Sequence, residues 1–361
     1  MGGDFENGWG VELARTKTRR HKEEVKARSA VHDRERQGAL TQSFEILASP
    51  NKFFFVPSCL CARSLLTTAN AKPRSKSKMT LKIAILTPAP DYDDVWSVPA
   101  ADYRRLLGDD IAFREWINPG DLSGFDLILP LIAWGYNRDC PAWFALLDRL
   151  EAENLPVANP AKLLRWNTDK AYLAELAEAG VATVPTLIRE SLNVAALASA
   201  REILESQRLV IKPPISGGAD GTYLIGPSDP LPAEAVGKRM LIQPFLPAIA
   251  EDGEYSLFYF GGQYSHAISK HPANGDFRVQ EQFGGVERSI DAPDDAKALA
   301  EAALAATDTL LHCGTPRYAR VDMVRDGAGQ FRLMELELIE PSLFLGFAED
   351  KGAMFAAAIL G

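Results

Sequence analysis

Cysteine is scarce in this chain of 361 residues, which has only Cys59, Cys61, Cys140 and Cys313. Four scattered thiols are too few for the disulfide framework of a small secreted protein, so ordinary reduced cysteines are expected. Long apolar runs are also missing, because none approaches the roughly 18 residues that a membrane span needs. These two absences predict a cytoplasmic protein without a membrane partner.

Basic residues are scarce in most of the chain. The whole sequence has a net charge of −9, but residues 1–78 hold 15 Lys and Arg against 8 Asp and Glu. They carry +7, which leaves −16 for residues 79–361. Binding the phosphates of nucleic acid needs clustered Lys and Arg, so this acidic body predicts no nucleic-acid partner.

Residues 15–36 mix both charges without apolar periodicity, and the stretch KPRSKSK at 72–78 has the composition of a flexible linker. Two interpretations are open for this part. One is that the chain starts physiologically at Met79, because the first credible strand begins at Leu81. The other is a disordered basic extension with a regulatory or targeting role.

From Met79 on, apolar segments of strand and helix length alternate. Strand, helix and strand in succession predict a small parallel α/β sheet covered by helices. The expected strands are 82–86, 125–131 and 157–160, and the expected helix is 141–153. A second helix is predicted over 168–179, with Asn167 as its N-cap and Lys170 in its first turn.

The rest of the chain has short apolar runs separated by turns. This pattern predicts α+β structure that is mostly antiparallel late in the chain. The expected strands are 209–213, 222–225, 240–243, 255–260, 264–270, 278–282, 318–324 and 331–339, with an Ala-rich helix over 294–312.

A glycine-rich loop, SGGADGT at 216–222, follows the strand that carries Lys212. Glycines let backbone N–H groups approach a phosphate chain closely, and a lysine on the strand supplies a cation. The order of residues differs from a Walker loop, in which the lysine follows the glycines, and from a dinucleotide fingerprint, in which the glycines open a helix. A plain hairpin turn is the alternative to phosphate binding.

Charged residues alternate along the last two expected strands. Glu335 and Glu337 are two apart, so both carboxylates are expected on one face of a strand. The apolar residues expected on the opposite face are Met334, Leu336 and Leu338. Arg320 and Asp322 have the same spacing on the strand before. Three carboxylates on one face favour a bound Mg²⁺ or Mn²⁺ ion, and a solvated sheet face is the alternative.

The segment QPFL at 243–246 ends a strand at Pro244, which has no N–H. A ligand held here by the backbone would use the Gln243 carbonyl and the Leu246 N–H. A strand that simply ends at proline is the alternative.

An acidic loop, DYDDVW at 91–96, follows the first strand at its carboxyl end, where open α/β sheets bind ligands. We expect Asp93 and Asp94, with Trp134, to help form a pocket for an amine or amino-acid-like substrate. An acidic surface loop with a buried tryptophan is the alternative.

Taken in order, these segments resemble the ATP-grasp superfamily of carboxylate-amine ligases, near its glutathione synthetase and RimK-like branch. The segments PDYDDVW, RWNTDKAYL, GDFRVQE and MELELIEPSLFL further resemble the group that includes the D-cycloserine-forming ligases. The resemblance implies an N-terminal α/β substrate domain and two α+β lobes that clasp ATP. The implied ranges are 79–161 for the substrate domain, 162–247 for the small lobe and 248–361 for the large lobe.

The resemblance also implies roles for single residues. Those that would bind ATP are Lys170, Lys212, Ser216, Gly217, Gly218, Gln243, Leu246 and Glu254, the last through the ribose hydroxyls. Arg278 and Arg320 would contact the phosphates and the transition state. The ligands of Mg²⁺ or Mn²⁺ would be Asp322, Glu335 and Glu337, although many relatives have Asn at the last of these positions.

The implied activity is Mg-ATP-dependent formation of a C–N bond, through an acylphosphate, on a small amino-acid-like substrate. No side-chain nucleophile is needed, which agrees with the lack of a convincing Ser-His or Cys-His arrangement in the sequence. The resemblance also makes a homo-oligomer plausible. The alternative is a non-catalytic regulatory protein that binds ATP, but the presence of every expected lysine, arginine and metal carboxylate favours the enzyme.

Overall fold

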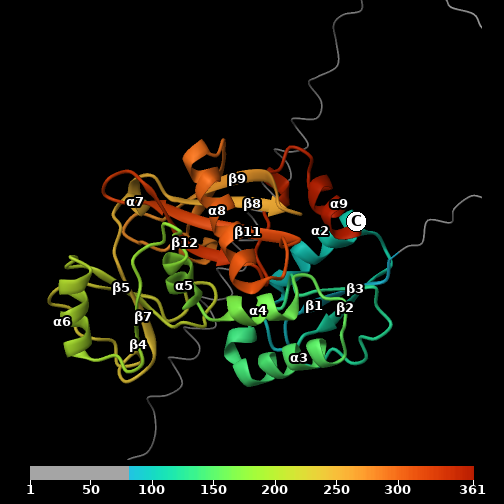
Figure 1. Cartoon of the computed structure of the whole chain (residues 1–361), viewed down its shortest axis with the longest axis horizontal. Coiled ribbons are helices and arrows are strands. Elements are labelled where there is room, and N and C mark those ends of the chain that lie inside the picture. Colours follow the sequence, from blue (N-terminus) through green and yellow to red (C-terminus); the bar gives the residue numbers. More distant parts are fainter. Residues whose placement is uncertain (1–80) are drawn as a thin grey trace, which may run out of the picture. The chain divides into compact units, whose positions relative to one another are not determined.

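The computed structural model describes residues 81–361, which form three separate sheets (Figure 1). Both interpretations of residues 1–78, a start at Met79 and a disordered basic extension, concern residues outside the described range. Within residues 81–361, no helix combines the length and the hydropathy needed to cross a membrane.

The first sheet is parallel, as the sequence predicts, in the order β2-β1-β3. Its strands are β1 (Ile83–Thr87), β2 (Ile111–Glu115) and β3 (Leu127–Leu129). Every residue of β1 is buried, as expected for the central strand of a parallel sheet whose two faces are covered. The helices of this region are η1 (Asp94–Trp96), α2 (Ser97–Leu107), η2 (Tyr136–Arg138) and α3 (Cys140–Ala152).

This region differs from the sequence prediction in two places. Neither β2 nor α2 is expected from the sequence, because polar residues interrupt the apolar pattern in both. The strand predicted over 157–160 is only a single bridge between Val157 and Ile128. Pro160 explains this, because it is the N-cap of the next helix and turns the chain away from the sheet.

The second sheet is antiparallel and has the order β4-β7-β5-β6. Its strands are β4 (Leu187–Arg189), β5 (Leu209–Lys212), β6 (Tyr223–Ile225) and β7 (Met240–Pro244). The helix α6 (Val194–Ile203) buries Leu197 and Ala200 in the same apolar cluster as these strands. Lys212 is thus the last residue of β5, and the glycine-rich loop joins β5 to β6. The one-turn helix α7 (Ala248–Glu251) follows β7.

The third sheet is also antiparallel and has the order β10-β9-β8-β11-β12. Its strands are β8 (Glu254–Phe260), β9 (Gln263–His271), β10 (Val286–Ile290), β11 (Tyr318–Arg325) and β12 (Phe331–Glu337). Around them lie η3 (Glu281–Phe283), α8 (Asp294–Leu311), η4 (Leu345–Phe347) and α9 (Ala353–Leu360).

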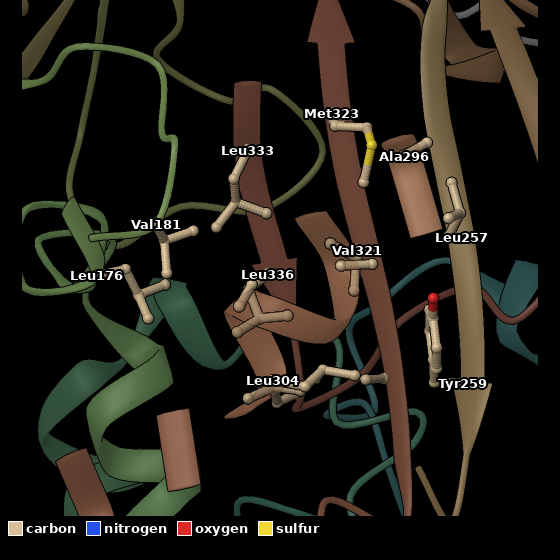
Figure 2. Packing of buried hydrophobic residues seen from close by; sticks show 14 of the residues in the cluster. Leu176, Val181, Leu257, Tyr259, Ala296, Leu304, Val321, Met323, Leu333 and Leu336 are labelled. Carbon is tan, nitrogen blue, oxygen red and sulfur yellow. The ribbon is translucent and has the colours of Figure 1, made fainter. Parts of the chain in front are cut away.

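One face of the third sheet forms the largest apolar cluster, part of which is drawn in Figure 2. Leu257, Val321 and Leu336 project from β8, β11 and β12 into it. Ala296 and Leu304 of α8 pack against them. With this face buried under α8, polar side chains at the alternate strand positions lie on the opposite face.

The helix predicted over 168–179 starts only at Tyr172, as α5 (Tyr172–Glu178), and a separate helix, α4 (Ala161–Thr168), precedes it. Asn167 is therefore in the last turn of α4 and is not an N-cap, and Lys170 lies in the link between the helices. The physical reason is that the Asn167 side chain bonds to the backbone of β12 and is not available to cap a helix.

The strand predicted over 278–282 is also wrong. Arg278 lies in a loop, and the edge strand β10 starts only at Val286. Asp276 stabilises the loop, because its carboxylate accepts hydrogen bonds from the N–H groups of Phe277 and Arg278 at 2.8 and 3.0 Å. Those N–H groups are not available to a strand ladder.

Each of the three predicted domain ranges contains one of the sheets. The helices α4 and α5, which fall within 162–247 apart from Ala161, nevertheless place Leu163, Leu173 and Leu176 in the core of the third sheet. The domain boundaries themselves stay a prediction.

Candidate active site

The pairing of β11 with β12 brings Arg320, Asp322, Glu335 and Glu337 together on one face, as the sequence spacing predicts. Asp322 lies opposite Glu335, and Arg320 lies opposite Glu337. This side of the third sheet is the carboxylate face.

The apolar side of β12 differs from the prediction at Met334. The register shifts between Asp322 and Met323, so β12 has a β-bulge with Met334 as the extra residue. Leu333 takes its place in the core and is fully buried together with Leu336. Bulges often re-aim side chains next to active sites, and this one leaves Glu335 and Glu337 on the same face.

Arg320 is the main partner of the carboxylates. Its Nε donates to both carboxylate oxygens of Asp322 at 3.0 Å, and its Nη2 donates to Asp322 at 2.9 Å and also to Glu337. Burial opposes ionisation of Asp322, which is 1% exposed, but Arg320 and Lys270 outweigh it and lower the pKa. Asp322 and Arg320 thus form a fixed buried ion pair.

Other carboxylates on this face are less well compensated. Burial raises the pKa of Glu337 to about 8, and Glu335, Asp322 and Glu340 add to the effect of burial while Arg320 opposes it. Burial also raises the pKa of Glu340 to about 7. Burial thus disfavours the ionised form of both carboxyl groups, and a cation bound nearby would favour it.

Lys270 on β9 is a further member of this face, and it is not among the site residues expected from the sequence. It is 6% exposed, it donates to Glu254 at 2.8 Å, and it lies 3.7 Å from Asp322. The signal that could have found it is the strand register, which sets Lys270 opposite Glu254. Glu254, predicted to bind ribose, is itself buried in this ion pair, and its role toward ribose stays a prediction.

Lys170 reaches the carboxylate face from the α4–α5 link. Its Nζ forms an ion pair with Glu335 at 3.1 Å and donates to the Ser216 carbonyl. Its backbone N–H donates to the Pro214 carbonyl at 2.8 Å. Burial lowers the pKa of Lys170, but Glu335 outweighs burial and the net pKa is raised. One lysine thus joins the glycine-rich loop to β12.

Lys212 has a different environment. It is 8% exposed, and its ammonium has no ion pair or hydrogen bond within residues 81–361. Burial lowers its pKa, with Glu335 opposing and the neighbouring Lys170 adding to the effect. An unpaired ammonium on a largely buried side chain suits an anionic ligand.

The glycine-rich loop lies between these two lysines. Gly218 and Gly221 have φ angles of +58° and +66°, a region that favours glycine. A Cβ at Gly221 would lie 2.9 Å from the Pro213 ring, so a side chain there would clash. Ser216 is buried, and Gln282 of η3 donates to the Gly218 carbonyl at 3.0 Å. The role of Ser216, Gly217 and Gly218 toward phosphate stays a prediction.

The outer edge of β12 pairs with the backbone of residues 182–184 at Leu333, but beside the carboxylates it bonds to side chains. The Tyr172 hydroxyl donates to the Leu336 carbonyl at 3.0 Å and accepts from the Leu336 N–H at 2.9 Å. The Asn167 side chain donates to the same carbonyl at 2.7 Å and accepts from the Leu338 N–H at 2.9 Å. Asn159 donates to the Leu338 carbonyl at 2.9 Å. These bonds fix the backbone on both sides of Glu337.

The predicted adenine-binding segment lies at the end of β7. Gln243 is buried, its side chain donates to Thr186 at 2.9 Å, and the strand continues through Pro244. The Phe245 N–H donates to the Arg208 carbonyl at 2.9 Å. Binding of a base by Gln243 and Leu246 stays a prediction.

Arg278 forms its ion pair with Asp276 and not with the carboxylates of β11 and β12. Its guanidinium donates to both carboxylate oxygens of Asp276 at 3.0 and 2.8 Å and lies 3.6 Å from the centre of the Phe283 ring. Asp276 has its pKa lowered to about 2, mainly by the hydrogen bond from Arg278. A contact of Arg278 with phosphate stays a prediction, and this ion pair would have to open first.

In the acidic loop at 91–96, the residue that packs against Trp134 is Tyr92, and not Asp93 or Asp94. Asp93 and Asp94 are both exposed. Tyr92 is half-buried, and its ring lies 6.3 Å from that of Trp134. Trp134 donates from Nε1 to the Glu340 carbonyl at 3.3 Å, so it connects this loop to the segment after β12. A substrate role for Asp93, Asp94 and Trp134 stays a prediction.

The predicted metal ligands do not form a ligand cluster as they stand. Within residues 81–361, no three His, Cys, Asp or Glu side chains are placed to hold one ion. Asp322 and Glu337 form ion pairs with Arg320, and Glu335 forms one with Lys170. The donor set nevertheless fits a hard divalent cation, because three carboxylates supply the oxygen ligands that such ions prefer.

Comparison with known proteins places this geometry in a family. No family model matches the chain. The cycloserine biosynthesis protein DcsG of Streptomyces lavendulae is 33% identical over 302 residues, which cover 74% of this chain and 93% of DcsG. The chain belongs to the ATP-grasp ligases. A glutathione synthetase of Ralstonia nicotianae is 25% identical over 198 residues, covering 51% of this chain and 57% of that protein.

Solved structures support the same assignment for this ATP-grasp ligase. The crystal structure of D-cycloserine synthetase DcsG matches with a TM-score of 0.65 and 29% identity, covering 77% of this chain and 98% of that one. D-alanine–D-alanine ligase of Bacillus anthracis matches in fold with a TM-score of 0.57 at 18% identity, covering 78% and 96%. The predicted fold class, ligase activity and dependence on ATP are confirmed.

Proposed function

We propose that this ligase activates the carboxylate of a small amino-acid-like substrate with Mg-ATP and joins it to an amine. The observation that carries the proposal is the convergence of two buried lysines on the carboxylate face. Lys170 and Lys212 come from different segments, flank one glycine-rich loop, and lie near Glu335 and Asp322. This arrangement suits a triphosphate and a divalent cation bound together.

ATP would lie between the second and third sheets, the proposed small and large lobes. Lys170, Lys212 and the N–H groups of the glycine-rich loop would contact the phosphates. Gln243 and Leu246 would meet the base, and Glu254 would meet the ribose. Lys270 joins this set, because its ammonium already faces Asp322 at 3.7 Å.

Asp322, Glu335 and Glu337 would hold Mg²⁺, with Mn²⁺ as a substitute. The ion would neutralise charge on the transferring phosphoryl group. Glu337 would bind it as a carboxylate, since a nearby cation lowers a carboxyl pKa. The residues that hold the ion are themselves held by Arg320, Lys170 and the hydrogen bonds at the edge of β12.

The proposed reaction has two steps. A substrate carboxylate oxygen attacks the γ-phosphorus, the bond to the β-phosphate oxygen breaks, and ADP leaves. An amine nitrogen then attacks the carbonyl carbon of the acylphosphate, the carbon–oxygen bond breaks, and phosphate leaves as the nitrogen loses a proton. Arg320 and the lysines stabilise charge and position the groups, which is most of what phosphoryl transfer needs.

The relative's name guides the choice of substrate. DcsG is named a D-cycloserine synthetase, and D-cycloserine is a small cyclic amino-acid derivative. By this likeness, the substrate of this chain is of amino-acid size and carries both a carboxylate and an amine. The two groups can belong to one molecule or to two.

The test is release of ADP and phosphate from Mg-ATP against a panel of D- and L-amino acids, with and without a second amine. At least one acid should raise release above the background rate, and the mass of the product will show whether one or two molecules are joined. Asp322→Asn should abolish the acid-dependent release. Bound ATP with no response to any acid in the panel would contradict the proposal.

A further inference from the structure

Tyr136 is a buried polar side chain that the proposed ATP chemistry does not use. It is 5% exposed, and its ring lies 5.0 Å from that of Trp143. Its hydroxyl has no hydrogen-bond partner within residues 81–361. Burial, and next the charges of Glu340, Glu335 and Glu337, raise its pKa well above the ordinary value. Tyr136 packs in the same buried cluster as Ile339, the residue before Glu340, and its hydroxyl is free to accept a hydrogen bond.

The Glu340 carboxylate is unpaired in a similar way. It forms no ion pair and no hydrogen bond to another residue in the described part of the chain. Lys170 and Arg320 are near enough to oppose the rise of its pKa, but they are paired with Glu335 and Asp322. Glu340 is half-buried, and a carboxylate in a partly desolvated position is stabilised by a cationic partner.

Aromatic rings border the same region. Trp134 donates from Nε1 to the Glu340 carbonyl at 3.3 Å, and the Tyr92 ring lies 6.3 Å from the Trp134 ring. The Tyr92 ring packs on the chain at Gly135, where a Cβ would come within 3.1 Å of it. Arg138 lies 4.6 Å from the centre of the Tyr92 ring. The segment from Trp134 to Arg138 therefore holds both the aromatic rings and Tyr136 near Glu340.

We infer that Glu340, Tyr136 and the ring of Trp134 form a subsite for the free ammonium of the substrate. Glu340 supplies the opposite charge, the Tyr136 oxygen accepts one N–H, and the indole ring attracts the cation through its π face. This inference rests on the proposed function and names the groups that select an amino acid over other acids. It assigns selection to Glu340 in place of the exposed Asp93 and Asp94.

The experiment measures kcat/KM for ADP release with matched acids that differ only at the amine. The pairs are D-alanine with D-lactate, D-serine with D-glycerate, and their L counterparts. The ratio of the amino acid to the hydroxy acid is the amine preference. Glu340→Gln should lower this ratio at least tenfold, Tyr136→Phe should lower it severalfold, and both should leave the KM for ATP unchanged. Glu349→Gln is the matched control, because Glu349 is exposed and the substitution removes the same charge.

The other outcomes separate failure of the subsite from failure of the proposed ligase activity. An unchanged ratio in Glu340→Gln overturns the subsite, and so does a loss of Mg²⁺ affinity with the ratio intact, which would make Glu340 a metal ligand. A wild-type enzyme that uses amino and hydroxy acids equally well overturns the subsite but keeps the ligase. A wild-type enzyme that responds to no acid overturns the proposed function and the subsite with it.

Discussion

The hydroxyl of Tyr172 bonds twice to one residue of β12, donating to the carbonyl of Leu336 and accepting from its N–H. Leu336 lies between Glu335 and Glu337. A helix residue therefore fixes the backbone that carries two of the proposed metal ligands, although 164 positions separate it from Leu336.

Replacing Tyr172 with Phe should destabilise the chain by about 1 to 3 kcal/mol, because the buried Leu336 N–H loses its partner. The carbonyl keeps its bond from Asn167. Urea unfolding measures the change, with Tyr223→Phe as the control, since the structure gives the half-buried Tyr223 hydroxyl no hydrogen bond within residues 81–361. Equal stability of the two variants would contradict this view of the β12 edge.

Lys212→Met and Lys170→Met should have opposite effects on stability. Removing the unpaired Lys212 ammonium should leave stability unchanged or raise it, whereas Lys170→Met leaves Glu335 without its partner and should lower it. Both should weaken ATP binding tenfold or more, since each removes a charge-assisted bond of about 1.5 to 3 kcal/mol. Unfolding and ATP titration of each variant are the measurements. A large loss of stability in Lys212→Met would show that its ammonium has a structural partner.

Asp276 should compete with ATP for Arg278. Asp276→Asn keeps the side-chain shape but removes the charge that binds the guanidinium, so the KM for ATP should fall severalfold. Arg278→Lys should raise it about tenfold, because lysine cannot make the same bidentate contact. Since the pKa of Asp276 is about 2, this competition should not vary with pH above about pH 4. A rise in KM in Asp276→Asn would mean that Asp276 orients Arg278 toward the phosphates.

His266 should make stability fall in mild acid. Its ring stacks on Phe258 at 4.2 Å, Nε2 bonds to the Leu343 carbonyl at 3.1 Å, and burial lowers its pKa from 6.5. The unfolded chain then takes up a proton near pH 6.5 and the folded chain only at lower pH. The free energy of unfolding should therefore decrease as pH falls below about 6.5.

His266→Gln is the variant that isolates this effect, because it does not titrate. Its stability difference from wild type should shrink between pH 7.5 and pH 5.5 as wild type loses stability. Urea unfolding at both pH values measures it. A difference that is the same at both pH values would show that His266 does not cause the acid sensitivity.

The spacing of charged residues within one strand is enough to predict which of them share a face of the sheet. The two-residue spacing of Glu335 and Glu337 and that of Arg320 and Asp322 were enough to predict one shared face, and the register confirms it. The extra residue at Met334 was not predictable, because a bulge keeps the local composition of a strand and changes only the pairing.

Contacts between distant segments explain most of the errors. Asn167 has the composition of an N-cap, yet its partners Leu336 and Leu338 are far along the chain. Lys270 gives no local sign that it faces Glu254, because that pairing depends on the register of β8 with β9. The apolar pattern predicts a strand at Arg278 because it does not reveal that the Arg278 backbone N–H donates to the Asp276 carboxylate.

The side chains along β12 also decide where this sheet could recruit another chain. An unpaired strand edge is a template for intermolecular pairing and aggregation. Tyr172, Asn167 and Asn159 already occupy the N–H and carbonyl groups of Leu336 and Leu338, so strand addition is blocked beside the carboxylates. The opposite edge, β10, has no such row of side-chain bonds within residues 81–361, and Val286 there is 52% exposed. Of the two edges of the third sheet, β10 is therefore the one open to strand addition, and the carboxylate face lies at the other edge.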